Sequence, residues 1–278
     1  MKNKKGILGN RMKKYESVAK TVLMKRTPVI IRIDGKAFHT FTRGFDKPFD
    51  SVLTKAMQDT LCYLCENIQG CVFGYTQSDE ITLVLCDYQK LTTSAWFDYE
   101  VQKLCSISAS MATMAFNKAF RHYAREFAID VYKEYALEIP EDVRKRIETY
   151  ENACKRGAMF DSRCFNVPVN EVTNCILWRQ QDATRNSIQS LGQHYFSHTE
   201  LDKKSCNMIQ DMLHEQKGVN WNDLPTYLKR GTACYVHGIT QLNEETQVFE
   251  TETKWILDLD MPILTGDDRE YVEQLIRF

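Results

Sequence analysis

The sequence contains little glycine and proline, 12 and 6 residues among 278, and it has no internal repeat or low-complexity segment. With 43% hydrophobic and 26% charged residues, this composition excludes a disordered or collagen-like chain and is typical of a globular protein. No apolar run approaches the ~18 residues of a transmembrane helix, and the N-terminal sequence lacks the apolar segment of a signal peptide. We therefore expect a cytoplasmic protein with no membrane partner.

The ten cysteines show neither a disulfide pattern nor a clear metal-binding pattern. They are scattered through apolar segments, which is typical of reduced, buried thiols in a cytoplasmic protein. Cys62 and Cys65 have the spacing of a zinc-binding pair, but they lie in a helical pattern and no second pair follows at zinc-finger spacing. We therefore do not expect a zinc site.

Charge is distributed unevenly along the chain, although the net charge is only −1. Residues 1–47 carry 13 Lys and Arg against three acidic residues, whereas residues 243–278 carry three basic residues against ten acidic ones. The basic segment suits a phosphate-rich partner, which the acidic segment would repel. Charge alone equally allows an ordinary solvated surface.

The apolar pattern predicts an α+β fold. Four β-rich runs occupy residues 28–34, 71–76, 81–86 and 164–169. Apolar residues spaced by three or four predict a helix that Asp50 caps and a second helix at about 96–127, with Met111 and Met114 in the core. The order β-α-β-β-α-β is that of a ferredoxin-like sheet with helices on one face.

Residues 134–157 are charged and lack a clear apolar period, so we expect an insertion, either helical or a loop. Residues 170–191 have a helical pattern. We divide the chain into residues 1–135, residues 136–240, which complete the same domain, and residues 241–278, an acidic C-terminal extension.

The first β-rich run ends in Asp34, and Asp79 lies at the tip of the following hairpin. In the predicted topology these strands are neighbours, so the two carboxylates converge. Gly35 has no Cβ, which lets its carbonyl oxygen approach a bound ion. Two carboxylates and a carbonyl suit Mg²⁺, which also takes phosphate oxygens as ligands. Alternatively, Asp79 and Glu80 are simply good turn residues.

Several ordered motifs resemble those of the tRNA-His guanylyltransferase family. They are Ile31-Arg-Ile-Asp-Gly-Lys-Ala-Phe-His39, Lys47-Pro-Phe-Asp50, Gln77-Ser-Asp-Glu80, Trp96-Phe97, Phe160-Asp-Ser-Arg163, Trp178-Arg-Gln180 with Asp182, Leu224-Pro-Thr-Tyr227 and Arg230-Gly-Thr232. The resemblance covers roughly residues 5–235. It implies a catalytic core like the palm of polymerases and the addition of nucleotides to the 5′ end of the tRNA acceptor stem in the 3′→5′ direction.

The resemblance also implies roles for individual residues. Asp34, the Gly35 carbonyl and Asp79 would hold two Mg²⁺ ions, with Asp34, Asp79 and Glu80 as the catalytic carboxylates. The residues expected to bind the nucleotide and its triphosphate are Lys36, Phe38, His39, Lys47, Ser78 and Lys103. ATP would activate a 5′-monophosphate, with GTP and other nucleoside triphosphates as substrates. Family members assemble as homotetramers. Basic candidates for tRNA phosphate contacts are Lys13, Lys14, Arg163, Arg179, Lys229 and Arg230.

The chain departs from the family pattern at two places. Eukaryotic enzymes carry His-Ile-Asn-Asn-Leu-Tyr-Asn where this chain reads Thr184-Arg-Asn-Ser-Ile-Gln-Ser190, and a family basic residue is replaced by Glu100. Because the lost motif is tied to selective guanylylation of tRNA-His, the resemblance favours template-dependent repair of truncated tRNA 5′ ends. Three alternatives remain. The protein could add G(−1) to tRNA-His, either selectively or as a side activity; it could be a nucleotidyl cyclase; or it could be a tRNA-binding protein without catalysis.

Overall fold

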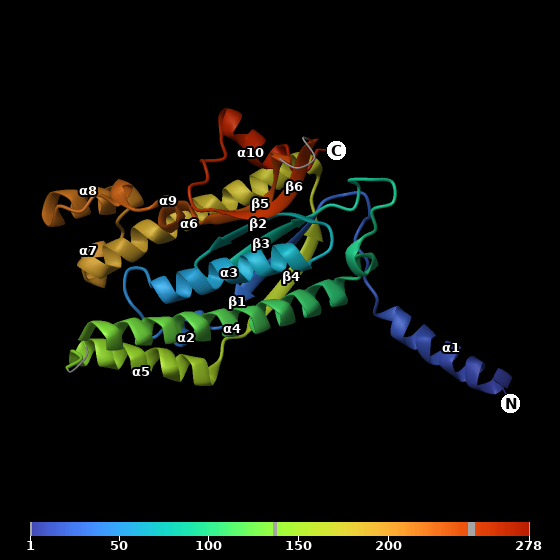
Figure 1. Ribbon diagram of the computed structural model, residues 1–278, viewed down its shortest axis with the longest axis horizontal. Helices are drawn as coiled ribbons and strands as arrows, with labels where there is room; N and C mark the ends of the chain where they lie inside the picture. The colour runs from blue at the N-terminus through green and yellow to red at the C-terminus, as the bar shows by residue number, and fades with distance from the viewer. Residues whose placement is uncertain (1, 136–137, 244–247, 278) are drawn as a thin grey trace.

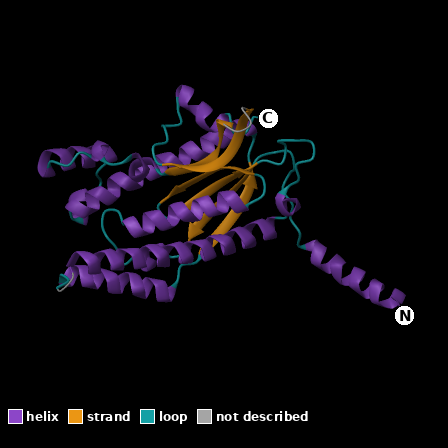
Figure 2. Cartoon of the chain, in the orientation of Figure 1, coloured by secondary structure: helices purple, strands orange, loops and turns teal. Residues whose placement is uncertain are grey.

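The computed structural model describes residues 2–135, 138–243 and 248–277. Within these ranges, six strands form one sheet in the order β4-β1-β3-β2-β5-β6, and all neighbouring strands are antiparallel (Figures 1 and 2). The strands are β1 (Val29–Gly35), β2 (Cys71–Gln77), β3 (Glu80–Leu85), β4 (Phe160–Asn166), β5 (Thr232–Asn243) and β6 (Val248–Asp258). The first four have the predicted ferredoxin-like order, which confirms the fold class.

Two long helices cover one face of the sheet. They are α3 (Ser51–Asn67) and α4 (Val101–Tyr135), which pack on each other and on the inward side chains of β1 and β3, such as Ile31, Ile33 and Leu83. The Asp50 side chain accepts a hydrogen bond from the Leu53 backbone N–H, which confirms it as the N-cap of α3. Every residue of β3 is buried because helices cover both faces of this central strand.

The opposite face carries α6 (Val172–Tyr195) and the C-terminal helix α10 (Glu270–Glu273), over a second core that includes Ile30, Phe73 and Val84 (Figure 1). The remaining helices are α1 (Lys2–Val18), α2 (Phe38–Phe41), α5 (Glu141–Arg156), α7 (His198–Leu201), α8 (Cys206–Lys217), α9 (Thr226–Arg230) and the 3₁₀ turns η1 (Trp96–Tyr99), η2 (Val169–Glu171), η3 (Trp221–Asp223) and η4 (Gly266–Arg269). Figure 1 shows α1 projecting away from the rest of the chain. No helix in the described ranges is both long and apolar enough to cross a membrane.

Some predicted details differ from the structure. Met114 is 56% exposed, so its predicted place in the core is wrong; Met111 does pack against the core. The second long helix begins at Val101, not at about residue 96, because Phe97 and Asp98 have positive φ angles and interrupt the helical backbone. The fourth strand begins at Phe160, four residues earlier than predicted, and ends at Asn166.

Residues 141–156 form a regular helix, α5, within the segment for which the sequence left helix and loop open. Its buried side chains, Ile147, Tyr150 and Ala153, face α4, and the Tyr150 hydroxyl donates a hydrogen bond to Asp50 Oδ2 at 2.7 Å. The apolar positions recur every three residues, a short stripe that the many charges of this segment obscure.

The C-terminal segment is part of the same folded unit as the rest of the sheet. The boundary drawn at residue 240 falls inside β5, and Met261 and Leu264 are fully buried in the second core. Gln180 of α6 donates from Nε2 to the Pro262 carbonyl at 2.7 Å and accepts from the Leu264 N–H at 3.1 Å. The C-terminal residues therefore complete the hydrophobic face of the sheet.

Leu264→Ala should lower the free energy of unfolding by about 2–5 kcal/mol, because it removes a fully buried side chain from this core. Ile263, the neighbouring residue, is 48% exposed, so Ile263→Ala should change stability by no more than about 0.5 kcal/mol. Urea unfolding of both variants measures the difference. Equal effects would show that the C-terminal segment does not contribute to the core.

Candidate active site

The pairing of β1 with β3 brings the predicted acidic residues together. Asp34 lies opposite Glu80 in the register of these strands, and the Gly35 N–H donates a hydrogen bond to the Asp79 carbonyl at 3.1 Å. Ser78, at the hairpin tip, has a φ of 51° and donates from its hydroxyl to Asp79 Oδ1 at 3.0 Å. The hairpin therefore fixes both the position and the orientation of the Asp79 carboxylate beside the end of β1.

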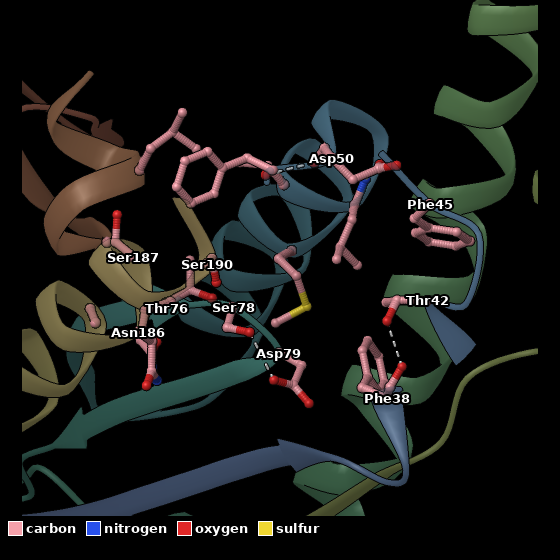
Figure 3. Close-up of a pocket in the computed structure, with 18 of the residues that line it drawn as sticks. Phe38, Thr42, Phe45, Asp50, Thr76, Ser78, Asp79, Asn186, Ser187 and Ser190 are labelled. Atoms are coloured by element: carbon pink, nitrogen blue, oxygen red, sulfur yellow. Dashed lines mark hydrogen bonds between the residues drawn. The ribbon is translucent and has the colours of Figure 1, made fainter. Parts of the chain in front are cut away.

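A cavity of about 560 Å³ opens beside these strand ends. One wall comes from the segment between β1 and α3 and includes Phe38, His39 and Lys47. Gly35, Ser78 and Asp79 form its base, and α6 supplies the facing wall. Figure 3 shows Asp79 and Ser78 between Phe38 on one side and Asn186 and Ser190 on the other. The volume is within the usual ~300–1,000 Å³ of a small-molecule site.

Gly35 is required by the packing of this corner. A Cβ at this position would lie 2.2 Å from the Phe38 ring, and Phe38 cannot move away because it packs against Phe41, Phe116 and Phe160. Phe38 is 5% exposed, so it is part of the core as well as of the cavity wall. Position 35 therefore has no room for a side chain, and its glycine lies at the end of β1 next to Asp34.

Burial raises the pKa of Asp79, with only partial compensation from the hydrogen bonds of Ser78 and the backbone. Burial also raises the pKa of Asp34, and the nearby carboxylates of Glu80 and Asp161 raise it further. The charged forms of both groups are therefore disfavoured in the absence of a nearby cation. A divalent cation at this position would offset that repulsion.

The donor set fits a magnesium site. It has two carboxylates and a carbonyl, all hard oxygen ligands, beside a cavity large enough for a phosphate chain. Within the described ranges, no three His, Cys, Asp or Glu side chains converge closely enough to hold a metal by themselves. The remaining coordination positions would thus fall to waters and substrate oxygens, as Mg²⁺ prefers.

Glu80 lies outside the cavity lining. Its Oε2 accepts hydrogen bonds from Arg32 at 2.8 Å and from Arg179 at 3.0 Å, and all three side chains are largely buried. Glu80 is thus the centre of a buried ion-pair network that links β1, β3 and α6. Arg179, a predicted tRNA-phosphate contact, is only 7% exposed and also pairs with Asp182, so this prediction is wrong.

The other predicted nucleotide-binding residues divide into two groups. Phe38, His39, Lys47 and Ser78 line the cavity. Lys36 is exposed beside it and is held through its backbone N–H by the Met159 carbonyl. Lys103 lies in the first turn of α4, where it contacts Glu100 and the Phe97 ring, and it does not line the cavity.

The sequence did not assign the facing wall of the cavity to the site. This wall contains Asn186, Ser187 and Ser190 of α6, together with Tyr227 and Thr232. Ser187 is fixed by a hydrogen bond from Trp221 Nε1 at 3.0 Å. The sequence holds signals for it: residues 184–190 stand at a family motif from which this chain departs, and residues 224–227 and 230–232 match family motifs. Their place opposite Asp79 depends on how α6 crosses the sheet.

Comparisons with known proteins agree on one family. A family model described as Thg1, tRNAHis guanylyltransferase, matches residues 9–168, more than half of the chain. The chain belongs to the Thg1 family. It is 38% identical to a bacterial Thg1-like protein solved in complex with ATP, with a TM-score of 0.76 and coverage of 98% of this chain and 100% of that one. A bacterial Thg1-like protein in complex with GTP is 37% identical, with a TM-score of 0.72 and coverage of 98% of this chain and 99% of that one.

More distant Thg1 relatives are similar over most of their length. The probable tRNA(His) guanylyltransferase of Dictyostelium discoideum is 23% identical over 262 residues, which is 88% of this chain and 91% of that protein. The structure from Saccharomyces cerevisiae is 20% identical, with a TM-score of 0.59 and coverage of 77% of this chain and 88% of that one, and shows the shared fold. The chain is accordingly a tRNA nucleotidyltransferase of the Thg1 type.

Mg²⁺ should raise the Tm of the protein more at pH 8 than at pH 5.5. Metal binding requires ionised carboxylates, and protonation competes in the range of the raised pKa values of Asp34 and Asp79. Without metal, stability should instead fall as the pH rises from the ordinary carboxyl range through these raised values, because ionisation is costlier in the folded state. Thermal unfolding with EDTA or Mg²⁺ measures both effects.

Asp79→Asn is the matched variant for this experiment. It should lose most of the Mg²⁺-dependent rise in Tm and, in EDTA at pH 8, should melt at a higher temperature than the wild type, because a desolvated charge is removed. A Mg²⁺ response equal to that of the wild type would exclude Asp79 as a ligand.

Glu80→Ala should lower the free energy of unfolding by about 3–5 kcal/mol, because it leaves the largely buried Arg32 without its carboxylate and Arg179 with Asp182 alone. Asp130→Ala is the control: it breaks an exposed ion pair with Lys133 and should cost no more than about 1 kcal/mol. Denaturant unfolding compares the two. Similar values would show that the Glu80 network contributes little to stability.

Proposed function

We propose that the protein adds nucleotides to the 5′ end of tRNA in the 3′→5′ direction and repairs truncated 5′ ends with the opposing strand as template. The observation that carries this proposal is the cavity in which Asp79, Ser78 and Gly35 lie between the Lys47 wall and the α6 wall. In that arrangement one nucleotide can meet the acidic corner and a basic side chain at the same time. The bacterial relatives that bind ATP and GTP support nucleotides as its ligands.

The proposed reaction has two displacements at phosphorus. The 5′-monophosphate of the RNA attacks the α-phosphorus of ATP and releases pyrophosphate, which leaves an adenylylated 5′ end. The 3′-hydroxyl of the incoming nucleotide then attacks the 5′ phosphorus and releases AMP. When bound, two Mg²⁺ ions would lower the pKa of the attacking hydroxyl and offset charge on the phosphates.

The residues of this chain orient the reactants. Asp34, Asp79 and the Gly35 carbonyl would hold the metal ions, and the Ser78 hydroxyl keeps the Asp79 carboxylate in place. Lys47 and His39 line the cavity, where their donors suit triphosphate oxygens. Lys36 lies close enough along the chain to contact phosphates at the mouth of the cavity.

The α6 wall supports templated repair over selective addition of G to tRNA-His. It keeps the amide of Asn186 but presents the small hydroxyl groups of Ser187 and Ser190 at two positions where the eukaryotic motif that is tied to tRNA-His has Asn. The Ser187 hydroxyl is engaged by Trp221. A wall of small side chains leaves the choice of base to pairing with the RNA.

We also propose a cytoplasmic protein that acts as a homotetramer. The cysteines are free thiols, as is usual in a reducing compartment. Light scattering coupled to size-exclusion chromatography tests the tetramer.

A 5′-extension assay tests the function. The substrates are a tRNA that lacks its first nucleotide, with each of the four bases in the opposing position, and intact tRNA-His. Reactions contain Mg²⁺, ATP and all four nucleoside triphosphates. We expect the added base to follow the opposing base and Asp79→Asn to lose activity at least about 100-fold, since it removes a metal ligand.

Other outcomes contradict the proposal. Addition of G alone, and only to tRNA-His, would show a selective guanylyltransferase. Formation of a cyclic nucleotide without RNA would show a cyclase. The absence of any product would favour a tRNA-binding protein without catalysis.

A further inference from the structure

Trp178 is a large aromatic residue on the surface of α6 that the proposed reaction does not use. Of the four tryptophans, it alone is exposed, with 50% of its surface accessible, whereas Trp96 is buried and Trp221 and Trp255 are half-buried. It does not line the cavity beside Asp79. A single exposed aromatic residue needs no explanation by itself, so the surroundings of the ring decide whether it can bind a ligand.

Two arginines hold the indole in place. Arg179 Cζ lies 3.6 Å from the ring centroid, and Arg32 Cζ lies 5.1 Å from it. Both guanidinium groups are themselves fixed by Glu80, at 3.0 and 2.8 Å. The ring is thus stacked on a buried ion-pair network, so it would lose little conformational freedom when a second flat group stacks on it.

The ring lies close to the acidic corner of the site. Arg32 and Asp34 are two residues apart on the same side of β1, about 6.6 Å along the strand. Glu80, which binds Arg32, is the cross-strand partner of Asp34. A group stacked on Trp178 would therefore lie on the same side of the sheet as Asp34 but outside the nucleotide cavity.

Exposed arginines flank the ring on both elements. Arg163 of β4 is the register partner of Arg32 and is 54% exposed. Arg185 lies seven residues after Trp178, on the same face of α6, and is 59% exposed. Arg163 pairs with the exposed Asp161 and Arg185 with the half-buried Asp182, and both guanidinium groups are exposed enough to reach a phosphate.

A flat aromatic surface between two exposed cations is the arrangement that binds single-stranded nucleic acid, in which bases stack and phosphates pair with arginine. We propose that Trp178 is a stacking platform for an unpaired nucleobase at the acceptor end of the RNA substrate. This inference rests on the proposed function for the identity of the RNA. Trp178 is a positioning residue: it would hold the acceptor end so that the 5′ phosphate faces Asp34 and Asp79.

Tryptophan fluorescence provides a direct test. Titration of the wild type with the truncated tRNA should quench the emission as a base stacks on the exposed indole, and Trp178→Phe should lose most of that quenching. ATP alone should leave the emission of Trp178 unchanged, because the nucleotide cavity does not include it. Quenching by ATP that Trp178→Phe abolishes would assign the ring to a mononucleotide and overturn the proposal.

Variants then measure what the stacking contributes. Trp178→Ala should weaken tRNA binding and raise the KM for tRNA by about 5- to 150-fold, the range for one stacked base, and leave the KM for ATP within about 3-fold. Trp178→Phe keeps a ring and should restore most of the affinity. Tyr195→Ala removes an exposed aromatic residue further along the same helix and is the matched control, with affinity unchanged.

Equal tRNA affinities of the wild type and Trp178→Ala would overturn the platform, as would a loss of affinity that Trp178→Phe does not restore. Binding and quenching do not depend on extension. Absence of templated extension together with Trp178-dependent quenching would therefore contradict the proposed function and leave the platform in place.

Discussion

The antiparallel pairing of β1 with β3 is the constraint on which the rest of the site depends. It sets Asp34 opposite Glu80 and ties the Gly35 N–H to the Asp79 carbonyl at 3.1 Å. A shift of one residue in this register would turn Asp34 toward the apolar core under α3 and α4. The apolar side chains of Ile31 and Ile33, fully buried on that face, make such a shift too costly, so the core fixes the geometry of the site.

This register concentrates negative charge at one corner of the sheet. The carboxylates there are stabilised in two different ways. Glu80 is neutralised within the protein by Arg32 and Arg179. Burial raises the pKa values of Asp34 and Asp79, and neither carboxylate forms an ion pair with a basic side chain of the described ranges. The carboxylates without a protein partner are those expected to bind cations, and the same arginines that neutralise Glu80 support the Trp178 ring.

Much of the fold was predictable because its signals are local. Alternating and helical apolar patterns located β1, α3, the β2–β3 hairpin and α6, and the topology followed from their order. The sequence does not distinguish helix from loop for α5, because its few apolar residues are buried only by packing on α4, which is not visible in the sequence. The sequence also gives no sign that the C-terminal segment belongs to the fold. Met261 and Leu264 are buried in the second core, beside a sheet that β5 and β6 extend.

The candidate site shows the same division between local and long-range information. The sequence predicts that Asp34 and Asp79 converge, since both are at strand ends, but it cannot show that Glu80 points to buried arginines or that Lys103 lies away from the cavity. The Asn186 wall depends on the path of α6 across the sheet, which no local pattern encodes.

A crystal structure with Mn²⁺ and a non-hydrolysable ATP analogue tests the central claim most directly. The account predicts two anomalous peaks, about 3.5–4 Å apart, within bonding distance of the Asp34 and Asp79 carboxylates and the Gly35 carbonyl, with the triphosphate in the cavity near Lys47. Metal peaks away from these oxygens, or a nucleotide bound outside this cavity, would contradict it.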